Sequence, residues 1–504
     1  MIGNAGFASR LATRVSRSLS ASGGCEGVLS VSLCGSQRRR YHVAVIGSGP
    51  AGFYTSKYLF KQAGNEKVHI DMFERLPVPF GLVRFGVAPD HPEVKNVQND
   101  FAQVAATPTF RFFGNVEVGK HVSLLSLKTS YDAVVVCTGA QGERTLGIAG
   151  EELNGVIGAP AFVKWYNGHP DFVHLKPAEP GEAAMVVGQG NVALDIARVL
   201  TSHPARMQET DIHGPALDLI QQWQRNGLRT VHVVGRRGFV QAAFTNAELR
   251  ELSNFSDEVL PIVDPEELKL SQNPASAEEL KNSRMKKRSI KMLEDMAKNF
   301  EHRKTTSKRI IWLRFLQSPS AILPDTAGAA VAGVRLDRTE LCGKAGSQSA
   351  VKADPPSSED VPCGLVVRSV GFDLTPMAGV PMEGTRIPHV EGRVTQAASE
   401  PGSLYVSGWV KRGPRGIIAS NIADAQETAK RLLLDLQARE QSSGADIAPV
   451  EDTLRTSGTR VVSFDDWGRI EAEEKRLGAE KGRIAVKFTD VDEMLRVVGP
   501  ASSA

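Results

Sequence analysis

The stretch HVAVIGSGPAGFYTSKYLFKQ spans residues 42–62. It begins with an apolar run typical of a buried parallel strand, His42–Ile46, and it ends with a helical run, Phe53–Gln62. Between them stands a G-x-G-x-x-G loop, residues 47–52. Because this loop joins a strand to a helix, the motif predicts a Rossmann-like dinucleotide-binding unit in an α/β fold.

The three loop glycines have separate expected roles. Gly47 permits a tight turn, Gly49 lets the backbone approach a pyrophosphate, and Gly52 permits close packing of the helix against the strand. The next strand, Val68–Phe73, ends in Glu74. A carboxylate there accepts hydrogen bonds from a ribose and repels a 2′-phosphate, so this site is expected to hold FAD or NAD. A purely structural glycine turn is the alternative.

A second loop of this type follows another short strand, Met185–Val187. It reads G-x-G-x-x-A over residues 188–193 and precedes a helical run. The next strand, Thr230–Val234, is followed closely by Arg236 and Arg237. Guanidinium groups bind phosphate through paired hydrogen bonds, so this site is expected to select NADP. A flavin site and an NADP site in one chain predict hydride transfer from NADPH to FAD.

Composition limits the other classes of function. The chain has 504 residues, 41% hydrophobic and 23% charged, so it can form more than one packed domain. A net charge of +3 does not suggest a nucleic-acid binder, and no apolar run is long enough to span a membrane. The five cysteines include no C-x-x-C pair and no cluster with metal-ligand spacing. No disulfide framework, metal site or redox-active dithiol is therefore expected.

Residues 1–40 differ in composition from the rest of the chain. They contain six arginines, eight serines and a single acid, Glu26. Residues 1–19 can form a helix with apolar side chains on one face and arginines toward the other. An Arg-rich, Ser-rich, acid-poor amphipathic start is typical of a mitochondrial transit peptide, and a disordered basic tail is the alternative.

Two further stretches carry a more specific signal. They are PFGLVRFGVAPDHPEVK, residues 79–95, and SGWVKRGP, residues 407–414. With the two glycine loops, they resemble the NADPH:adrenodoxin oxidoreductases, which are ferredoxin–NADP reductases of the glutathione-reductase-like fold. The resemblance extends from about residue 41 to the C-terminus and includes VSFDDW, residues 462–467.

The resemblance implies two Rossmann-like domains. The FAD-binding domain is expected to be discontinuous, residues 41–142 and 369–504, and the NADP-binding domain is expected to be residues 143–368. Residues 343–362 are rich in Gly, Ser, Pro and Asp, a composition that predicts a long loop.

The resemblance also implies cofactor contacts at matching positions. For FAD these are Ala51, Glu74, Leu82, Val118, Trp409, Gly416, Ile417 and Ile418. For NADP they are Gln189, Gly190, Asn191, Val192, Arg236, Arg237, Glu248 and Gly416. One departure lies beside Gly416, where Arg415 stands in place of the smaller residue expected in the G-P-x-G turn.

Two residues are candidates for proton handling. His91 follows Asp90 in the family-specific stretch, and Asp195 lies one turn into the helix after the second loop. A histidine can titrate near neutral pH. Structural hydrogen bonding is the alternative for both residues.

A basic segment suggests where a protein partner binds. Lys281–Arg309 carries eleven Lys or Arg and three acids. Ser276–Glu279 resembles a capping box, and Leu293, Met296 and Phe300 follow at helical spacing. An acidic [2Fe–2S] ferredoxin, the partner implied by the resemblance, would be steered by such a face, and a solvated helix is the alternative. The expected docking cations are Arg284, Lys286, Lys287 and Arg288.

The resemblance implies an enzyme that passes electrons from NADPH through FAD, one at a time, to a mitochondrial adrenodoxin-like ferredoxin. That ferredoxin would supply cytochrome P450 and related pathways, including steroid metabolism. The implied location is the mitochondrial matrix, compatible with peripheral association with the inner membrane. Alternatives are another NADPH-dependent flavoprotein, such as a disulfide reductase or a monooxygenase, and a non-catalytic NADP-binding protein. The lack of C-x-x-C counts against a disulfide reductase.

Overall fold

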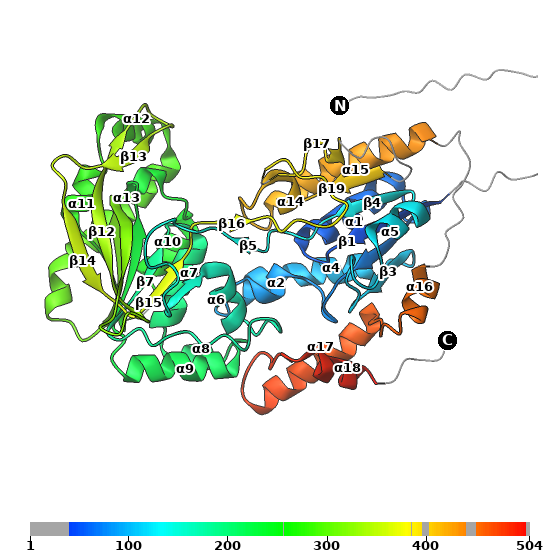
Figure 1. Ribbon diagram of the computed structural model, residues 1–504, viewed down its shortest axis with the longest axis horizontal. Helices are drawn as coiled ribbons and strands as arrows, with labels where there is room; N and C mark the ends of the chain where they lie inside the picture. Colours follow the sequence, from blue (N-terminus) through cyan, green and yellow to red (C-terminus); the bar gives the residue numbers. More distant parts are fainter. Residues whose placement is uncertain (1–39, 256, 385, 396–402, 440–449, 500–504) are drawn as a thin grey trace, which may run out of the picture. The chain divides into compact units, whose positions relative to one another are not determined.

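The computed structural model describes residues 40–499, apart from residue 256, residue 385, 396–402 and 440–449 (Figure 1). All but the last residue of the predicted transit peptide therefore lies outside the described residues. Within the described ranges, no helix is both long and apolar enough to cross a membrane.

The first glycine loop belongs to a seven-stranded sheet. Five neighbouring strands are parallel, and two short strands pair antiparallel at one edge. In spatial order the strands are β17 (His389–Val390), β18 (Arg393–Val394), β19 (Ser403–Val406), β4 (Ala133–Val136), β1 (Tyr41–Ile46), β2 (Val68–Phe73) and β3 (Phe110–Phe113). Because β19 pairs with β4, segments far apart in the sequence build one sheet (Figure 1).

Strand β1 shows why this part of the sequence lacks apolar–polar alternation. Val43 and Val45 point into one buried apolar cluster, and Ala44 and Ile46 point into another. Both faces of the sheet are covered, so every position from Val43 to Ile46 is apolar. The covering helices and turns are α1 (Pro50–Ala63), α2 (Leu82–Phe85), α3 (Pro92–Lys95), α4 (Val97–Ala105), α5 (Leu124–Ser130), α14 (Trp409–Arg412), α15 (Ser420–Arg439), α16 (Val450–Thr456), α17 (Phe464–Glu480) and α18 (Val491–Val498).

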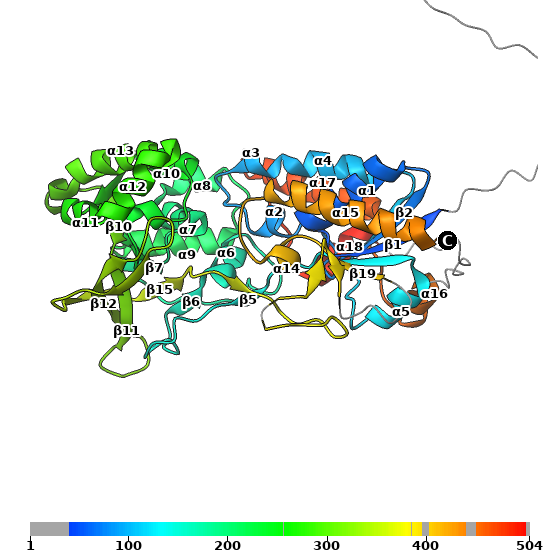
Figure 2. The same cartoon turned by 90° about the horizontal axis from the view of Figure 1, so that it is seen from above.

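The second glycine loop belongs to a six-stranded sheet in which all neighbours are parallel. Its strands are, in order, β6 (Val156–Gly158), β15 (Leu365–Arg368), β7 (Ala183–Val187), β8 (Thr230–Gly235), β10 (Arg309–Phe315) and β9 (Val259–Val263). Its helices are α6 (Ala159–Tyr166), α7 (Asn191–Thr201), α8 (Pro204–Gln208), α9 (Gly214–Arg225), α10 (Asn246–Ser253), α11 (Pro265–Leu270), α12 (Pro274–Asn282) and α13 (Arg284–Lys298). Figure 2 shows α10 to α13 gathered along one face of this sheet.

A small ribbon lies where the chain passes between the two sheets. Strands β5 (Gly142–Glu143) and β16 (Phe372–Asp373) pair antiparallel. They adjoin the predicted domain boundaries at residues 142 and 369. Two sheets with parallel cores, each with its own glycine loop, agree with the predicted pair of Rossmann-like units. The exact domain boundaries stay a prediction.

The prediction of a long loop over residues 343–362 is wrong. A third, antiparallel sheet contains β11 (Gln317–Pro324), β12 (Val331–Cys342), β13 (Ser349–Lys352) and β14 (Ser358–Pro362). The side chains of β13 and β14 are mostly exposed. These strands are stabilised by pairing with β12 rather than by burial. Their sequences are therefore polar and lack the apolar pattern that predicts a strand.

The capping box predicted at Ser276–Glu279 is also wrong. Asn273 caps α12, and its Oδ1 accepts a hydrogen bond from the N–H of Ser276 at 2.8 Å. The helix ends at Asn282, and Ser283 caps a separate helix, α13. Ser276 is buried, and its hydroxyl donates to Oε1 of Gln348 instead of accepting a hydrogen bond from a backbone N–H at the helix start.

Candidate functional site

The first glycine loop has the geometry of a phosphate cradle. Gly47 has a φ of +103°, and a Cβ there would lie 2.7 Å from the carbonyl oxygen of Cys137. A Cβ on Gly52 would clash with the carbonyl oxygen of Gly47. Gly49 is the N-cap of α1, and a Cβ there would meet no atom within 4 Å. The fold therefore requires Gly47 and Gly52, whereas Gly49 leaves open space at a helix N-terminus, the place where a pyrophosphate binds.

Glu74 lies beside this loop. Its Oε2 accepts hydrogen bonds from the backbone N–H and the hydroxyl of Ser48, at 3.2 and 2.7 Å. Its Oε1 accepts from the N–H of Leu76 at 3.1 Å. The carboxylate is half-buried and has further lone pairs, so it can also accept a hydrogen bond from a ribose hydroxyl.

The chain returns to the start of α1 after β19. Gly408 has a φ of +82°, and a Cβ there would clash with the Cβ of Ala51. Trp409 packs on Phe372, with 4.9 Å between the ring centroids. The N–H of Gly408 donates to the buried side chain of Asp424 on α15 at 2.5 Å. The structure thus brings Ala51 next to the Gly408–Trp409 turn, although they are separated by more than 350 residues in the sequence.

Two more predicted FAD contacts lie near these groups. A Cβ on Gly81, the residue before Leu82, would lie 3.2 Å from the Cα of Gly49, so the two segments approach closely. Val118 lies in the turn after β3, two residues beyond Val116, whose N–H donates to the carbonyl of Glu74 at 2.8 Å. Both predicted contacts therefore belong to segments that touch the loop or the acid.

Three of the predicted FAD contacts lie in the turn before α15. Gly416, Ile417 and Ile418 precede the helix, which begins at Ser420. The N–H of Ile417 donates to the hydroxyl of Ser420 at 3.1 Å. Gly416 has a φ of +88°, and Ile417 is 58% exposed. Gly416 and Ile417 are therefore exposed in this turn, whereas Ile418 is partly buried against the apolar core.

The second glycine loop repeats the pattern of the first. Gly188 has a φ of +132°, and a Cβ there would clash with the carbonyl oxygen of Ser369. Gly190 is the N-cap of α7, and a Cβ there would meet no atom within 4 Å. Two open helix N-termini in one chain fit the pyrophosphates of two dinucleotides.

The other predicted NADP residues of this loop have structural partners. The Nε2 of Gln189 donates to the carbonyl of Arg314 at 2.7 Å. The Oδ1 of Asn191 accepts from the N–H of Thr245, the N-cap of α10, at 2.9 Å. Val192 is half-buried at the start of α7. These contacts connect the loop to β10 and α10.

Arg236 and Arg237 directly follow β8, and both side chains are exposed. Among the described residues, neither guanidinium group has an ion pair or a hydrogen-bonding partner. Two free guanidinium groups at the end of the second strand of this unit fit the recognition of a 2′-phosphate.

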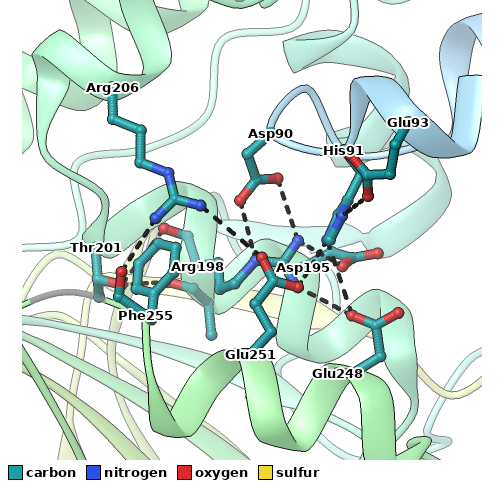
Figure 3. A network of polar contacts seen from close by, with 11 residues as sticks. Asp90, His91, Glu93, Asp195, Arg198, Thr201, Arg206, Glu248, Glu251 and Phe255 are labelled. Atoms are coloured by element: carbon teal, nitrogen blue, oxygen red, sulfur yellow. Dashed lines mark hydrogen bonds and ion pairs between the residues drawn. The ribbon is translucent and has the colours of Figure 1, made fainter.

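A buried arginine joins the two nucleotide-binding regions (Figure 3). Arg198 on α7 is fully buried. Its Nε and Nη2 donate to Asp90 at 3.0 and 3.1 Å, and its Nη2 lies 2.9 Å from Asp195. Its Nη1 pairs with Glu248 at 3.1 Å and with Glu251 at 3.4 Å, both on α10. The positive charge inside the cluster makes it an ion-pair network rather than a metal centre.

His91 belongs to the same network. Its Nε2 lies 3.0 Å from Oε2 of Glu251, and its Nδ1 lies 2.8 Å from Oε1 of Glu93. The hydrogen bond to Glu251 raises the pKa of His91 to about 9, so the imidazole is protonated at neutral pH.

The carboxyls around Arg198 titrate differently. Desolvation raises the pKa of Asp195 to about 7. Desolvation acts to raise the pKa of Asp90 as well, but the charge and hydrogen bonds of Arg198 bring it below its usual range. Asp195 is therefore the carboxyl of this network that can exchange a proton near neutral pH.

The structure brings His91, Asp195 and Glu248 together, although they were singled out for different roles. Sequence reasoning missed Arg198 and Glu251. A signal for both existed, because each lies three residues after a predicted site residue on a helix, and this spacing places two side chains on one face.

The basic segment forms α13 and the short 3₁₀ helix η2 (Phe300–Lys304). Leu293 and Met296 are buried as expected. Lys286 is only partly exposed and pairs with Glu279, with 2.5 Å between Nζ and Oε2. The three fully exposed cations of the predicted docking set are Arg284, Lys287 and Arg288.

Comparisons with known proteins agree with this geometry. A family described as "Pyridine nucleotide-disulphide oxidoreductase" matches residues 41–254. The chain is 43% identical over 470 residues to human "NADPH:adrenodoxin oxidoreductase, mitochondrial", which covers 92% of this chain and 93% of the relative. It is 38% identical to the Arabidopsis thaliana protein of the same name, over 91% of this chain and 95% of that one.

A solved structure is also similar. "Mycobacterium tuberculosis FprA in complex with NADPH" superposes with a TM-score of 0.83 and 39% sequence identity. The match covers 91% of this chain and all of that one. The same fold over nearly the whole chain confirms the predicted α/β class with two Rossmann-like units.

Proposed function

The chain belongs to the NADPH:adrenodoxin oxidoreductase family, and from this premise we propose that it delivers electrons from NADPH singly to a [2Fe–2S] ferredoxin. It is an FAD- and NADP(H)-dependent oxidoreductase. One observation carries the assignment of the two sites: Glu74 ends the second strand of one unit, whereas Arg236 and Arg237 end that of the other.

The FAD site is built around the first glycine loop. Gly49 and the amino end of α1 receive the pyrophosphate, and Glu74 receives the ribose hydroxyls. Ala51 and Trp409 line the same place, because Gly408 packs directly on Ala51. The remaining contacts of this proposed site are Gly47, Gly52, Leu82, Val118, Gly416, Ile417 and Ile418.

The NADP site is built around the second loop. Gly190 and the amino end of α7 receive the pyrophosphate, and Arg236 and Arg237 bind the 2′-phosphate. Its other proposed contacts are Gln189, Asn191, Val192, Glu248 and Gly416. Glu248 already pairs with Arg198, so its contact to the nucleotide also ties the nucleotide to the buried network.

Bound FAD accepts a hydride from NADPH and can release electrons one at a time. The side chains of the network handle the accompanying proton. The imidazolium of His91 holds a proton at Nε2, facing Glu251. Asp195, with a pKa of about 7, exchanges a proton at its carboxyl, and Arg198 keeps both groups in place.

The exposed cations of α13 supply the docking surface, because an acidic partner is attracted and oriented by a field of opposite sign. The Arg-rich start of the chain and the mitochondrial relatives support residence in the mitochondrion. There the ferredoxin would be of the adrenodoxin type, and the matrix, with or without contact to the inner membrane, would be the site of action.

One experiment tests the function. The purified protein is mixed anaerobically with NADPH, flavin absorbance near its visible maximum is followed, and an oxidised [2Fe–2S] ferredoxin is then added. We expect bleaching followed by reduction of the ferredoxin. Bleaching without ferredoxin reduction would contradict the proposed acceptor, and no bleaching would indicate a non-catalytic NADP-binding protein. An added disulfide substrate that is not reduced serves as the control.

A further inference from the structure

The third sheet holds the backbone of Arg236 and Arg237. The carbonyl oxygen of Arg236 accepts a hydrogen bond from Oγ1 of Thr339 on β12, at 2.7 Å. The carbonyl oxygen of Arg237 accepts one from the N–H of Leu316, at 3.2 Å. The N–H of Thr339 in turn donates to the carbonyl of Leu316, at 2.9 Å. Two consecutive carbonyls after β8 are therefore fixed by one pair of residues.

Both supporting residues are buried, with 6% of Thr339 and 3% of Leu316 exposed. Leu316 lies between β10 and β11 and has a φ of +56°. A bulky side chain rarely adopts this conformation, which persists only where the surroundings hold it and is common at functional sites. In this conformation the N–H of Leu316 donates to the carbonyl of Arg237, and its carbonyl accepts from the N–H of Thr339.

The far end of the same segment is held as well. Gln241 ends the 3₁₀ helix η1 (Phe239–Gln241). Its Nε2 donates to Oε1 of Gln348 at 3.0 Å and to the hydroxyl of Ser276 at 3.3 Å. Gln348 lies just before β13 and is buried. The segment 236–241 is thus anchored at both ends, by Thr339 and Leu316 at one end and by Gln348 and Ser276 at the other. The two exposed guanidinium groups therefore extend from a fixed backbone.

We propose that Thr339 is a positioning residue for the choice of NADPH over NADH. The proposal rests on the proposed function, since it takes Arg236 and Arg237 as the 2′-phosphate ligands. Paired hydrogen bonds from guanidinium to phosphate require a defined direction. A backbone fixed before the nucleotide arrives lowers the ordering cost of binding. Thr339 has no place in either glycine loop, so its effect is confined to the phosphate that distinguishes the two nucleotides.

The test uses the FAD-loaded enzyme and two probes, 2′,5′-ADP, which carries the 2′-phosphate, and 5′-AMP, which does not. Thr339→Val removes the hydroxyl with little change of shape and leaves the carbonyl of Arg236 without its donor. We expect its dissociation constant for 2′,5′-ADP to rise about fivefold, the size of one hydrogen bond. Binding of 5′-AMP should be unchanged. Thr339→Ser keeps the hydroxyl and should bind 2′,5′-ADP like the parent.

Steady-state kinetics with ferricyanide as acceptor provide the second measurement. Thr339→Val should raise the KM for NADPH by a similar factor and leave kcat and all NADH constants unchanged. If Thr339→Val bound 2′,5′-ADP and 5′-AMP equally more weakly than the parent, the role of Thr339 would be merely structural and the proposal would be overturned. The proposal would also be overturned if Thr339→Val bound 2′,5′-ADP as tightly as the parent while Arg236→Ala/Arg237→Ala bound it more weakly. If that double variant also binds normally, the proposed function of the arginines fails instead.

Discussion

Arg84 on α2 and Glu474 on α17 form a buried, two-pronged ion pair across 390 residues of sequence. The distances are 3.0 Å from Nη1 to Oε2 and 2.5 Å from Nη2 to Oε1. The two residues are 6% and 1% exposed. Oε1 of Glu474 also accepts the N–H of Phe488 at 2.8 Å. This pair fixes the C-terminal segment against the family-specific stretch that begins at residue 79.

Glu474→Gln should destabilise the protein strongly. A buried guanidinium that loses its carboxylate is an uncompensated charge, which costs about 3–5 kcal/mol. We expect a lower urea midpoint, measured by tryptophan fluorescence. The double variant Arg84→Met/Glu474→Leu removes both charges and should be more stable than Glu474→Gln. A double variant less stable than Glu474→Gln would contradict the argument that an uncompensated buried charge is what destabilises the single variant.

Gly49→Val and Gly190→Val should separate the two cofactors. Both glycines have φ values that other residues adopt, −76° and −114°, and open space at the Cβ, so both variants should fold. The first should purify with little FAD, because the side chain occupies the place of the pyrophosphate. The second should retain FAD but not be bleached by NADPH. Full flavin content in Gly49→Val would contradict the first assignment.

Arg236→Ala/Arg237→Ala should lose selectivity for NADPH. Two charge-assisted hydrogen bonds contribute about 3 kcal/mol together, so kcat/KM for NADPH should fall about 100-fold. The value for NADH should change little, since it has no 2′-phosphate. Steady-state rates with both nucleotides check this, and unaltered discrimination would remove the arginines from the 2′-phosphate site.

Charge reversal on α13 should slow ferredoxin reduction. The variant Arg284→Glu/Lys287→Glu/Arg288→Glu should lose at least about tenfold in rate at low salt. The parent's rate should fall as salt shortens the Debye length from about 10 to 3 Å. Reduction of a small neutral acceptor should be nearly unaffected.

A matched control separates docking from net charge. Lys176, Arg225 and Arg229 are exposed cations elsewhere in the NADP-binding region. Their triple reversal to Glu changes the net charge equally and should slow ferredoxin reduction much less. Equal effects of the two triple variants would assign the loss to overall charge and move the docking surface away from α13.

His91→Gln should destabilise the protein in a pH-dependent way. The pKa of His91 is raised from 6.5 to about 9, so its stabilisation is complete below pH 6.5 and disappears as the pH rises through 9. The variant should be less stable than the parent by about 2–3 kcal/mol at pH 6. The difference should approach zero above pH 9.5. Urea unfolding at several pH values measures it, and a constant difference would mean lost packing rather than lost charge.

The local parts of the site could be predicted from the sequence. Each glycine loop lies between a strand and a helix, and the residue type after the next strand predicts which ribose each loop binds. The predictions for Glu74 and Arg236 therefore rest on short stretches of sequence alone. The missed strands have the opposite property, because they depend on contacts with a distant part of the chain. Strands β13 and β14 are held by pairing with β12 and not by burial, so no apolar pattern marks them.

Long-range charge pairs were invisible for a related reason. The spacing of three residues from Asp195 places Arg198 on the same helix face, but only the fold brings Asp90 and Glu251 to it. The sequence identified His91 and Asp195 as separate candidates, but it did not predict the ion-pair network that joins them. A motif identifies a residue type at a position, whereas a buried ion-pair network depends on three segments meeting.

The pairing of β19 with β4 has a consequence for biosynthesis. β4 ends at Val136, but its neighbour on that side does not leave the ribosome until residues 403–406 have been translated. The parallel core of the first sheet therefore stays incomplete with an unpaired edge while the whole second unit is made and can fold. Exposed strand edges promote aggregation, so this architecture leaves the half-finished protein with an aggregation-prone edge throughout the synthesis of the second unit.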